Sequence, residues 1–196
     1  MNRETQSGKI FLVGARASGK TSVGLRLAEA LAYDFWDTDA WLSGKEGLTV
    51  AEIVARSGWA AFRELESAAL REAGRGPRRV VATGGGMVLA AANRAFMRAG
   101  GLVFYLAAPA EVLAARLAAA PEREQRPSLT GRPAEDEAAL VLAEREKFYL
   151  ETAHQVVAAE APLEAVVADI LGRLRALAAL AGPGKRDGLG PAGEGL

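Results

Sequence analysis

The residues from Gly14 to Thr21 have types and spacing that can bind the phosphate groups of a nucleotide. Gly14 is followed after four residues by the tripeptide Gly19–Thr21, which fits the pattern G-x-x-x-x-G-K-[ST]. In such a loop the backbone N–H groups surround the phosphates, the lysine ammonium reaches the terminal phosphates, and the hydroxyl helps to hold Mg²⁺. The expected phosphate-binding residues are Gly14, Ala15, Arg16, Ala17, Ser18, Gly19, Lys20 and Thr21. A glycine-rich turn that only caps a helix is the alternative.

Two carboxylates follow a second apolar run further along the chain. Asp37 and Asp39 lie in the stretch FWDTDAW, at the end of the run Tyr33–Trp36. One carboxylate could reach the coordination sphere of Mg²⁺, and the other could accept a hydrogen bond or a proton from a substrate hydroxyl. In the alternative interpretation, Thr38 or Asp39 only caps the following helix. The fragment by itself favours neither interpretation.

Arg63 and Glu66 lie in the helical pattern WAAFRELESAAL. They are three residues apart, so they can pair on one face of a helix. Taken alone, this pair is best interpreted as a surface ion pair with little effect on stability.

Three consecutive glycines, Gly84–Gly86, follow the apolar run Arg79–Ala82. Three glycines in a row cost backbone entropy, so this position requires either a close approach to the backbone or a turn with positive φ. A plain tight turn needs only one glycine. The sequence therefore favours a ligand that lies against the backbone here.

A polar, proline-punctuated stretch, AAPEREQRPSLTGRPAED, spans residues 119–136. Long loops in compact domains are often lids over active sites. Its candidate residues for neutralising phosphate charge are Arg123, Arg126 and Arg132. Solvated loop arginines are the alternative. Arg116, on the preceding helical pattern, is a candidate contact for the adenine base.

Apolar runs and helical patterns alternate along the chain. Strands are expected at Ile10–Val13, Tyr33–Trp36, Arg79–Ala82, Leu102–Leu106 and Gln155–Ala158. Helices are expected at Thr21–Ala32, Thr49–Arg56, Trp59–Ala73, Ala90–Arg98, Ala110–Ala119, Glu135–Glu151 and Leu163–Leu180. The alternation predicts an α/β fold with a parallel sheet, helices on both faces, and ligands at the carboxyl ends of the strands. His154, just before the last strand, is interpreted as structural.

The composition of the 196 residues argues against several classes of function. Lys+Arg and Asp+Glu both number 24, and the zero net charge argues against non-specific nucleic-acid binding. The chain has no cysteine and one histidine, so disulfides, thiolate metal sites and histidine metal clusters are excluded. No apolar run approaches the roughly 20 residues of a membrane span, and the first residues lack the pattern of a secretory signal. We therefore expect a cytoplasmic protein without membrane partners.

One folded domain is expected over residues 9–180, with the lid at about 119–136. Residues 1–8 are expected to be a flexible N-terminus. Residues 181–196 are rich in glycine and proline, which predicts a disordered tail. The expected oligomeric state is a monomer.

Taken in order, these motifs resemble those of the shikimate kinase family. The order is GARASGKT, DTD, FRELE, ATGGG and RPSLTG, and the similarity runs from about Lys9 to about Leu180. The resemblance implies a P-loop kinase of the nucleoside-monophosphate-kinase type, with a five-stranded parallel sheet and a lid loop. It also implies phosphorylation of the 3-hydroxyl of shikimate, with ATP and Mg²⁺, in aromatic amino-acid biosynthesis. A same-fold kinase for another polyol such as gluconate, or a non-catalytic nucleotide-binding homologue, are the alternatives.

The resemblance also implies roles for individual residues. The catalytic residues would be Lys20, Asp39 and Arg126. ATP would contact the Gly14–Thr21 loop, the lid residue Arg126 and, on its adenine side, Arg116. Mg²⁺ would lie at Thr21 and Asp37. Shikimate would contact Asp39, Arg63, Gly85 and Gly86, with Glu66 orienting Arg63.

One position departs from the pattern that the resemblance implies. A tyrosine followed by a second carboxylate-binding arginine is expected near the end of the long helix, but the stretch reads EKFYLETAH, with Leu150 after Tyr149. Three interpretations remain open: a weakened carboxylate site, replacement of the arginine by Lys147, and a different substrate.

Overall fold

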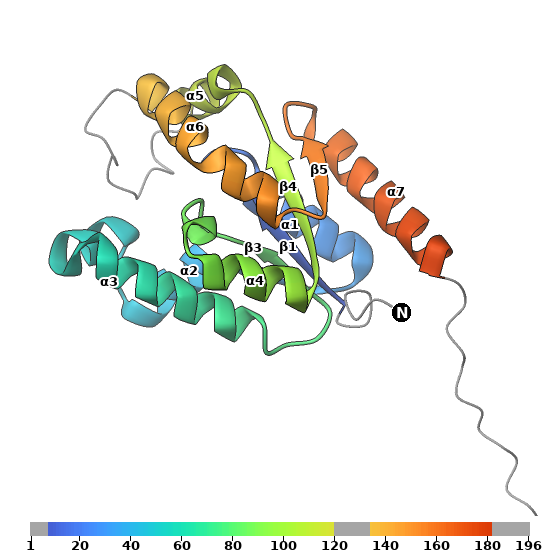
Figure 1. The fold of residues 1–196 in the computed structure, drawn as a ribbon, viewed down its shortest axis with the longest axis horizontal. Helices are drawn as coiled ribbons and strands as arrows, with labels where there is room; N and C mark the ends of the chain where they lie inside the picture. The colour runs from blue at the N-terminus through green and yellow to red at the C-terminus, as the bar shows by residue number, and fades with distance from the viewer. Residues whose placement is uncertain (1–7, 120–133, 182–196) are drawn as a thin grey trace, which may run out of the picture.

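Five parallel strands form the centre of the molecule. The computed structural model describes residues 8–119 and 134–181, and within these ranges the sheet has the order β2-β3-β1-β4-β5 (Figure 1). The strands are β1 (Lys9–Val13), β2 (Asp34–Asp37), β3 (Arg79–Ala82), β4 (Leu102–Ala107) and β5 (Gln155–Ala158). All four neighbouring pairs are parallel. The carboxyl ends of the strands therefore meet at one edge of the sheet.

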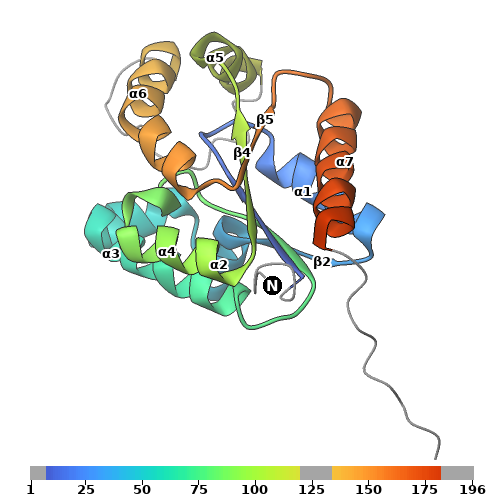
Figure 2. The same ribbon diagram turned by 45° about the vertical axis from the view of Figure 1, so that its right-hand side comes forward.

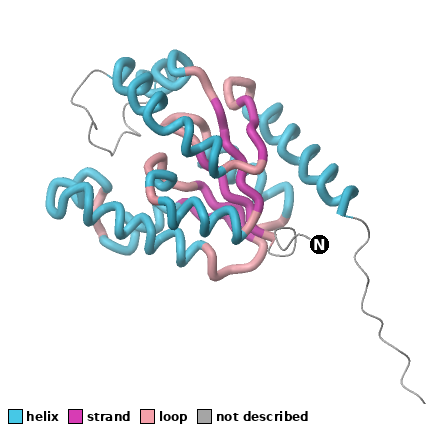
Figure 3. Tube along the Cα trace, viewed as in Figure 1, coloured by secondary structure: helices cyan, strands magenta, loops and turns pink. Residues whose placement is uncertain are grey.

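Helices cover both faces of this sheet (Figure 2). On one face α1 (Lys20–Leu31) packs against α7 (Leu163–Ala181). On the other face α4 (Ala91–Gly100) and α6 (Ala134–Thr152) pack against each other and against β4. Two further pairs of elements stand around this layer (Figure 3): α5 (Ala110–Ala119) packs on α6, and α2 (Thr38–Glu46) packs on α3 (Val50–Ala73).

The central strands are buried on both faces, as in parallel sheets generally. Phe11, Leu12, Val103 and Phe104 have no exposed surface, and they form the main core with the inner faces of the helices. A second, smaller core surrounds Phe62 between α2 and α3. The α2–α3 unit thus has packing of its own beside the sheet.

The predicted α/β fold with five parallel strands is confirmed, and each strand lies within one residue of its expected bounds. The two helices expected at Thr49–Arg56 and Trp59–Ala73 form the single α3, in which Gly58 has the non-helical φ of 77°. The helix α2 and the short 3₁₀ helix η2 (Met87–Leu89) were not predicted. The lid arginines Arg123, Arg126 and Arg132 lie outside the described residues.

Within residues 8–119 and 134–181, no helix combines the length and the apolar character that a membrane span requires.

Candidate active site

Three loops meet at the carboxyl edge of the sheet. The loop Gly14–Gly19 follows β1, the carboxylates Asp37 and Asp39 stand at the end of β2, and Gly84–Gly86 follow β3. Because β3 pairs with both β1 and β2, these loops are neighbours in space although they are distant in the sequence. This juxtaposition defines the candidate active site.

The loop after β1 has the backbone conformation of a phosphate cradle. Gly14 and Gly19 have φ angles of 153° and 90°, and Ala17 lies in the left-handed region at φ 61°. The Lys20 ammonium donates hydrogen bonds to the carbonyl oxygens of Gly14 at 2.9 Å and Ala15 at 2.7 Å. Lys20 therefore lies across the loop, where an anion held by the loop N–H groups would meet its charge.

The residues expected at Mg²⁺ are in direct contact. The Thr21 hydroxyl donates to Asp37 Oδ2 at 2.8 Å, and this pair of oxygen atoms suits a hard divalent cation. Among the described residues no group of three or more His, Cys, Asp or Glu side chains could hold a metal ion.

The helix cap, which the alternative interpretation placed at Thr38 or Asp39, is made by Asp37. Asp37 Oδ1 accepts hydrogen bonds from the backbone N–H groups of Asp39 at 3.0 Å and Ala40 at 3.2 Å. The Thr38 hydroxyl instead accepts the N–H of Gly84 at 3.0 Å. Asp37 can cap because its extended backbone precedes the first helical residue. Its second oxygen still faces Thr21, so the structural and the functional interpretations hold together.

Arg63 and Glu66 form a partly buried ion pair, which contradicts the surface pair favoured from their spacing. The Glu66 side chain is only 1% exposed and that of Arg63 26%, and Arg63 Nη1 donates to Glu66 Oε2. The Arg63 guanidinium also lies 5.3 Å from the centre of the Trp59 ring. It lies against Gly86 as well, a contact between distant segments that the helical spacing alone did not reveal.

The three glycines serve a close approach rather than a positive-φ turn. None of them is among the described glycines with positive φ, and Gly86 has φ −93°. A Cβ atom at Gly86 would collide with the guanidinium of Arg63, whereas one at Gly85 would lie 3.5 Å from its nearest neighbour. The Gly85 carbonyl accepts a 2.6 Å hydrogen bond from the Tyr149 hydroxyl. The glycines thus let Arg63 lie against the backbone.

Arg116 bridges the phosphate loop and the far edge of the sheet. Its guanidinium donates to the carbonyl of Ala159 at 2.8 Å and, more weakly, to that of Ala17 at 3.4 Å. His154 has the structural position expected for it, because its Nδ1 accepts the backbone N–H of Val103 at 3.0 Å.

A buried arginine on α6 was missed in the sequence. Arg145 is only 7% exposed, and its Nε is buried without a hydrogen-bond partner in the described part of the chain. It precedes Tyr149 by four residues, so both occupy one face of α6, and Tyr149 reaches the glycine loop. The signal that could have found Arg145 is this four-residue spacing, which is the spacing of neighbours on one face of a helix.

Leu150, by contrast, is 51% exposed on α6. Consecutive helical residues point about 100° apart, so position 150 turns away from the face that carries Tyr149. A cation on the α6 face that carries Tyr149 does not require an arginine at position 150, because Arg145 lies on that face. Lys147 lies 4.9 Å from the centre of the Phe148 ring.

Beside Arg63 and Gly86 lies an open hollow of about 480 Å³. Ser67 and Asn93 also line it. A small polar ligand bound in this hollow would lie within reach of the Arg63 guanidinium.

A parallel sheet of this order with a lysine-bearing phosphate loop defines a P-loop kinase. Deoxyadenosine kinase from M. mycoides, only 13% identical, shares this fold with a TM-score of 0.56 over 86% of this chain and 99% of that one. The family model described as "Shikimate kinase" matches residues 16–175, and the chain belongs to this family.

Individual relatives agree with this assignment. Shikimate kinase 2 of Dickeya chrysanthemi is 55% identical over 170 residues, which cover 87% of this chain and 98% of that protein. Shikimate kinase from Acinetobacter baumannii, solved in complex with shikimate, has a TM-score of 0.79 and 31% identity, over 89% of this chain and 95% of that one. Shikimate kinase from Aquifex aeolicus has a TM-score of 0.74 and 32% identity, over 87% and 98%.

Proposed function

We propose that this protein transfers the γ-phosphoryl group of ATP to the 3-hydroxyl of shikimate, giving shikimate 3-phosphate and ADP. The observation that best supports this proposal is that two hydrogen bonds hold three loops together. The Thr21 hydroxyl, at the end of the phosphate loop, donates to Asp37, and the hydroxyl of Thr38, which follows Asp37, accepts the N–H of Gly84. A phosphate donor and a small polar acceptor bound at these loops would meet at one edge of the sheet.

ATP binds with its phosphates in the loop Gly14–Thr21. The Lys20 ammonium, which lies across two loop carbonyls, turns to the phosphates and neutralises charge that develops during transfer. Arg116 supports the loop from the adenine side through Ala17. Arg126, which lies outside the described residues, is the proposed lid arginine over the phosphates.

Mg²⁺ is held by Thr21 and Asp37 in this proposal. Bound there, the ion would supply positive charge that neutralises the phosphate groups of ATP during the transfer. Asp37 keeps its capping bonds with Oδ1 and uses Oδ2 toward the metal, so α2 need not unwind.

Asp39 is the proposed general base. It takes the proton of the 3-hydroxyl while that oxygen attacks the γ-phosphorus, and the bond from phosphorus to the β–γ bridging oxygen breaks to release ADP. Asp39 stands in the first turn of α2, two residues beyond the metal-binding Asp37. That spacing separates the base from the metal ligand while keeping both at the same edge.

The carboxylate of shikimate lies between Arg63 and Arg145 in this proposal. Arg63 is oriented by the buried Glu66 and packs on Gly86, which fixes one cation on α3. Arg145 offers the second cation from the face of α6 that meets the glycine loop. Two guanidinium groups from different elements recognise a carboxylate more tightly than either alone, because each charge-assisted bond adds affinity.

An ADP-release assay with shikimate, quinate and gluconate as acceptors tests the proposal. We expect turnover with shikimate, dependent on added Mg²⁺, and a product phosphorylated at the 3-hydroxyl in ³¹P NMR. Faster turnover with gluconate would assign a different acceptor. Absence of turnover with every acceptor, in protein that binds ATP, would indicate a non-catalytic nucleotide-binding protein.

The remaining proposals concern organisation and location. We propose a monomer with one kinase domain over residues 9–180, acting in the cytoplasm without nucleic-acid or membrane partners. The balanced charge of 24 basic and 24 acidic residues supports the absence of a nucleic-acid partner. Light scattering coupled to size-exclusion chromatography would test the monomer, and a mass of twice 20.5 kDa would contradict it.

A further inference from the structure

We propose that Arg94, on α4, is a positioning residue that sets the spacing between the two halves of the shikimate carboxylate site. The inference rests on the function proposed above. Arg94 does not take part in the chemistry. It joins the segment that supports Arg63 to the helix that carries Arg145.

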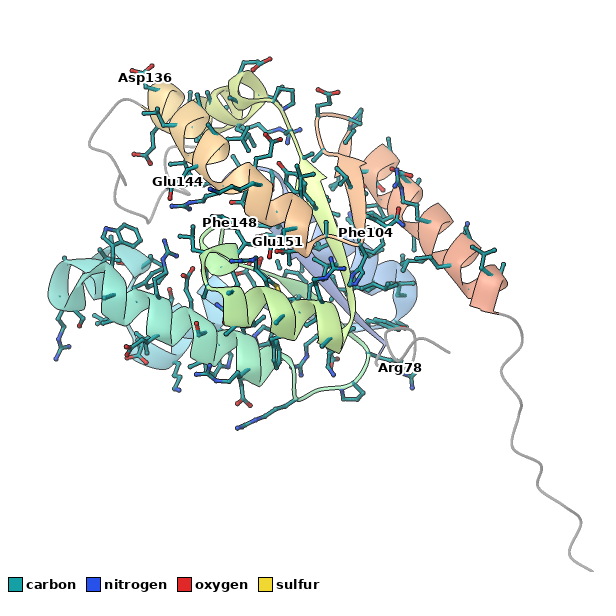
Figure 4. The ribbon with its side chains drawn as sticks, in the orientation of Figure 1. Arg78, Phe104, Asp136, Glu144, Phe148 and Glu151 are labelled. Carbon is teal, nitrogen blue, oxygen red and sulfur yellow. The ribbon has the colours of Figure 1, made fainter. Side chains whose placement is uncertain are left out.

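The Arg94 guanidinium bonds to two separate segments. Its Nη1 donates to the carbonyl oxygens of Val88 at 2.8 Å and Leu89 at 3.2 Å, at the end of η2. Its Nε donates to Glu151 Oε1 at 3.1 Å, at the end of α6. Its Cζ atom lies 4.7 Å from the centre of the Phe148 ring. Phe148 and Glu151 stand between α6 and α4 (Figure 4).

Arg94 is well placed to transmit position because it is almost enclosed. Its side chain is only 13% exposed, whereas Glu151 remains 58% exposed. A planar guanidinium with several donors in fixed directions holds its partners in one geometry. The partly buried carbonyl contacts also lose little to screening by solvent.

Each of the two segments carries a part of the carboxylate site. The 3₁₀ helix η2 begins directly after Gly86, whose backbone supports the Arg63 guanidinium. The last two turns of α6 carry Arg145 and Tyr149. The segments touch where the Tyr149 hydroxyl donates to Gly85. A shift of α6 relative to η2 would therefore change the distance between Arg63 and Arg145.

The neighbouring Asn93 extends this connection to α3. Its Nδ2 donates to the Met87 carbonyl at 3.2 Å and to Ser67 Oγ at 3.0 Å. Ser67 in turn donates to the carbonyl of Arg63 at 2.9 Å. Two consecutive residues of α4 thus connect α3, η2 and α6, the three elements around the carboxylate.

Arg98 provides a matched control on the same helix. Its Nη1 donates to the carbonyl oxygens of Glu151, Thr152 and Ala153, at 3.0, 3.2 and 3.0 Å. Among the described residues, its hydrogen bonds all go to the end of α6. Arg98 therefore stabilises the same α4–α6 contact as Arg94 without holding η2.

The experiment compares steady-state kinetics and melting temperature for wild type, Arg94→Ala, Arg94→Lys and Arg98→Ala. We expect Arg94→Ala to raise KM for shikimate by roughly tenfold or more, with KM for ATP unchanged, since small misplacements of binding groups have large effects. Arg98→Ala should lower the melting temperature and leave KM for shikimate near the wild-type value. Arg94→Lys should raise KM for shikimate by less, because an ammonium cannot reproduce the planar set of bonds.

If the wild-type protein phosphorylates shikimate, two results would overturn the role proposed for Arg94. One is an equal KM for shikimate in Arg94→Ala and Arg98→Ala, which would make Arg94 a helix-packing residue only. The other, if Arg94→Ala does not fold, is a wild-type KM for shikimate in Arg94→Lys. Wild-type protein that binds ATP but does not phosphorylate shikimate would refute the proposed function itself, and the positioning role with it.

Discussion

The nucleotide side and the shikimate side of the proposed active site are built in opposite ways. The nucleotide side consists of one continuous loop, 14–21, whose own backbone and lysine shape it. The shikimate side combines residues from α2, α3, α6 and the glycine loop, held together by bonds such as Tyr149 to Gly85 and Thr38 to Gly84. A single substitution therefore acts locally on the first side, but can act through neighbouring elements on the second.

This difference indicates which side of the active site can change its substrate specificity. The phosphate loop binds a group that every ATP-dependent kinase shares, so its geometry depends on few positions. The shikimate side depends on the relative placement of elements, and this placement rests on side chains such as Arg94 and Asn93, which join α4 to the neighbouring elements. Substitutions on the two sides should therefore have distinguishable kinetic effects.

Loss of the phosphate-loop cation should have the largest effect. Lys20→Ala should reduce kcat/KM by roughly 10³–10⁵-fold, the range known for cations that neutralise phosphoryl-transfer charge. The fold should persist, because the Lys20 ammonium hydrogen-bonds to Gly14, Ala15 and Ser18 of its own loop rather than to the core of the sheet. Circular dichroism and the ADP-release assay would measure both. Lys45→Ala, on the exposed end of α2, serves as the control. An unchanged kcat in folded Lys20→Ala protein would contradict the phosphate-loop assignment.

Removal of the proposed base should act on the chemical step. Asp39→Asn keeps the shape of the side chain and removes its charge, so kcat should fall by roughly 10²–10⁴-fold. Asp34→Asn makes the same change at the exposed start of β2, and its kcat should match wild type. Steady-state kinetics distinguish the two sides here. An increase confined to KM for ATP would place Asp39 on the nucleotide side instead.

The third prediction sharpens the shikimate side by comparing Arg145 with Leu150. Arg145→Met removes a charge-assisted contact worth about 1.5–3 kcal/mol, which corresponds to a rise in KM for shikimate of roughly ten- to a hundredfold. Leu150→Arg should leave this KM almost unchanged, because position 150 is exposed on α6.

Arg175→Met, exposed on α7, is the control for the loss of an arginine. A tighter KM for shikimate in Leu150→Arg, with no effect of Arg145→Met, would reverse the assignment. It would support the weakened carboxylate site that the residue after Tyr149 suggested.

The smallest effect concerns Tyr105 of β4. Its ring stacks on the ring of Tyr149, with the two ring centres 5.1 Å apart. Burial, and next the charge of Glu146, raise the pKa of the Tyr105 phenol above its ordinary value. The unfolded chain therefore releases this proton first, and the free energy of unfolding should fall as pH rises above about 10. Urea titrations between pH 8 and 11 would measure the slope. Tyr105→Phe should make the decline shallower, and an identical decline in both proteins would contradict this cause.

Local spacing was enough to predict the elements and the nucleotide side. The loop 14–21 and the strands around it follow from short-range patterns, and the strands lie within one residue of their expected bounds. The two helices expected at Thr49–Arg56 and Trp59–Ala73 correspond to the two parts of α3 on either side of the non-helical Gly58. The helix α2 entered only as the helix that Thr38 or Asp39 would cap, and no bounds were predicted for it.

The shikimate side could be predicted only in part. Spacing placed Arg63 and Glu66 on one face of a helix, but it favoured a surface pair because nothing local shows that Arg63 packs against Gly86. The family pattern pointed to the residue after Tyr149 as the second arginine. In the structure, the arginine that is buried on the face of Tyr149 is Arg145, four residues before the tyrosine, and it is therefore the one that we propose for this role.

The parallel α/β fold, the phosphate loop and the identity of the chemical groups follow from the sequence alone, because they depend on periodicity and on contacts between residues close in the chain. Which groups face one another depends on the tertiary structure. Arg63 lies against Gly86, Tyr149 reaches Gly85, and Arg94 joins η2 to α6 through Glu151, which lies 57 positions later in the sequence. Such long-range contacts arise from the packing of whole helices on the sheet, which no local pattern encodes.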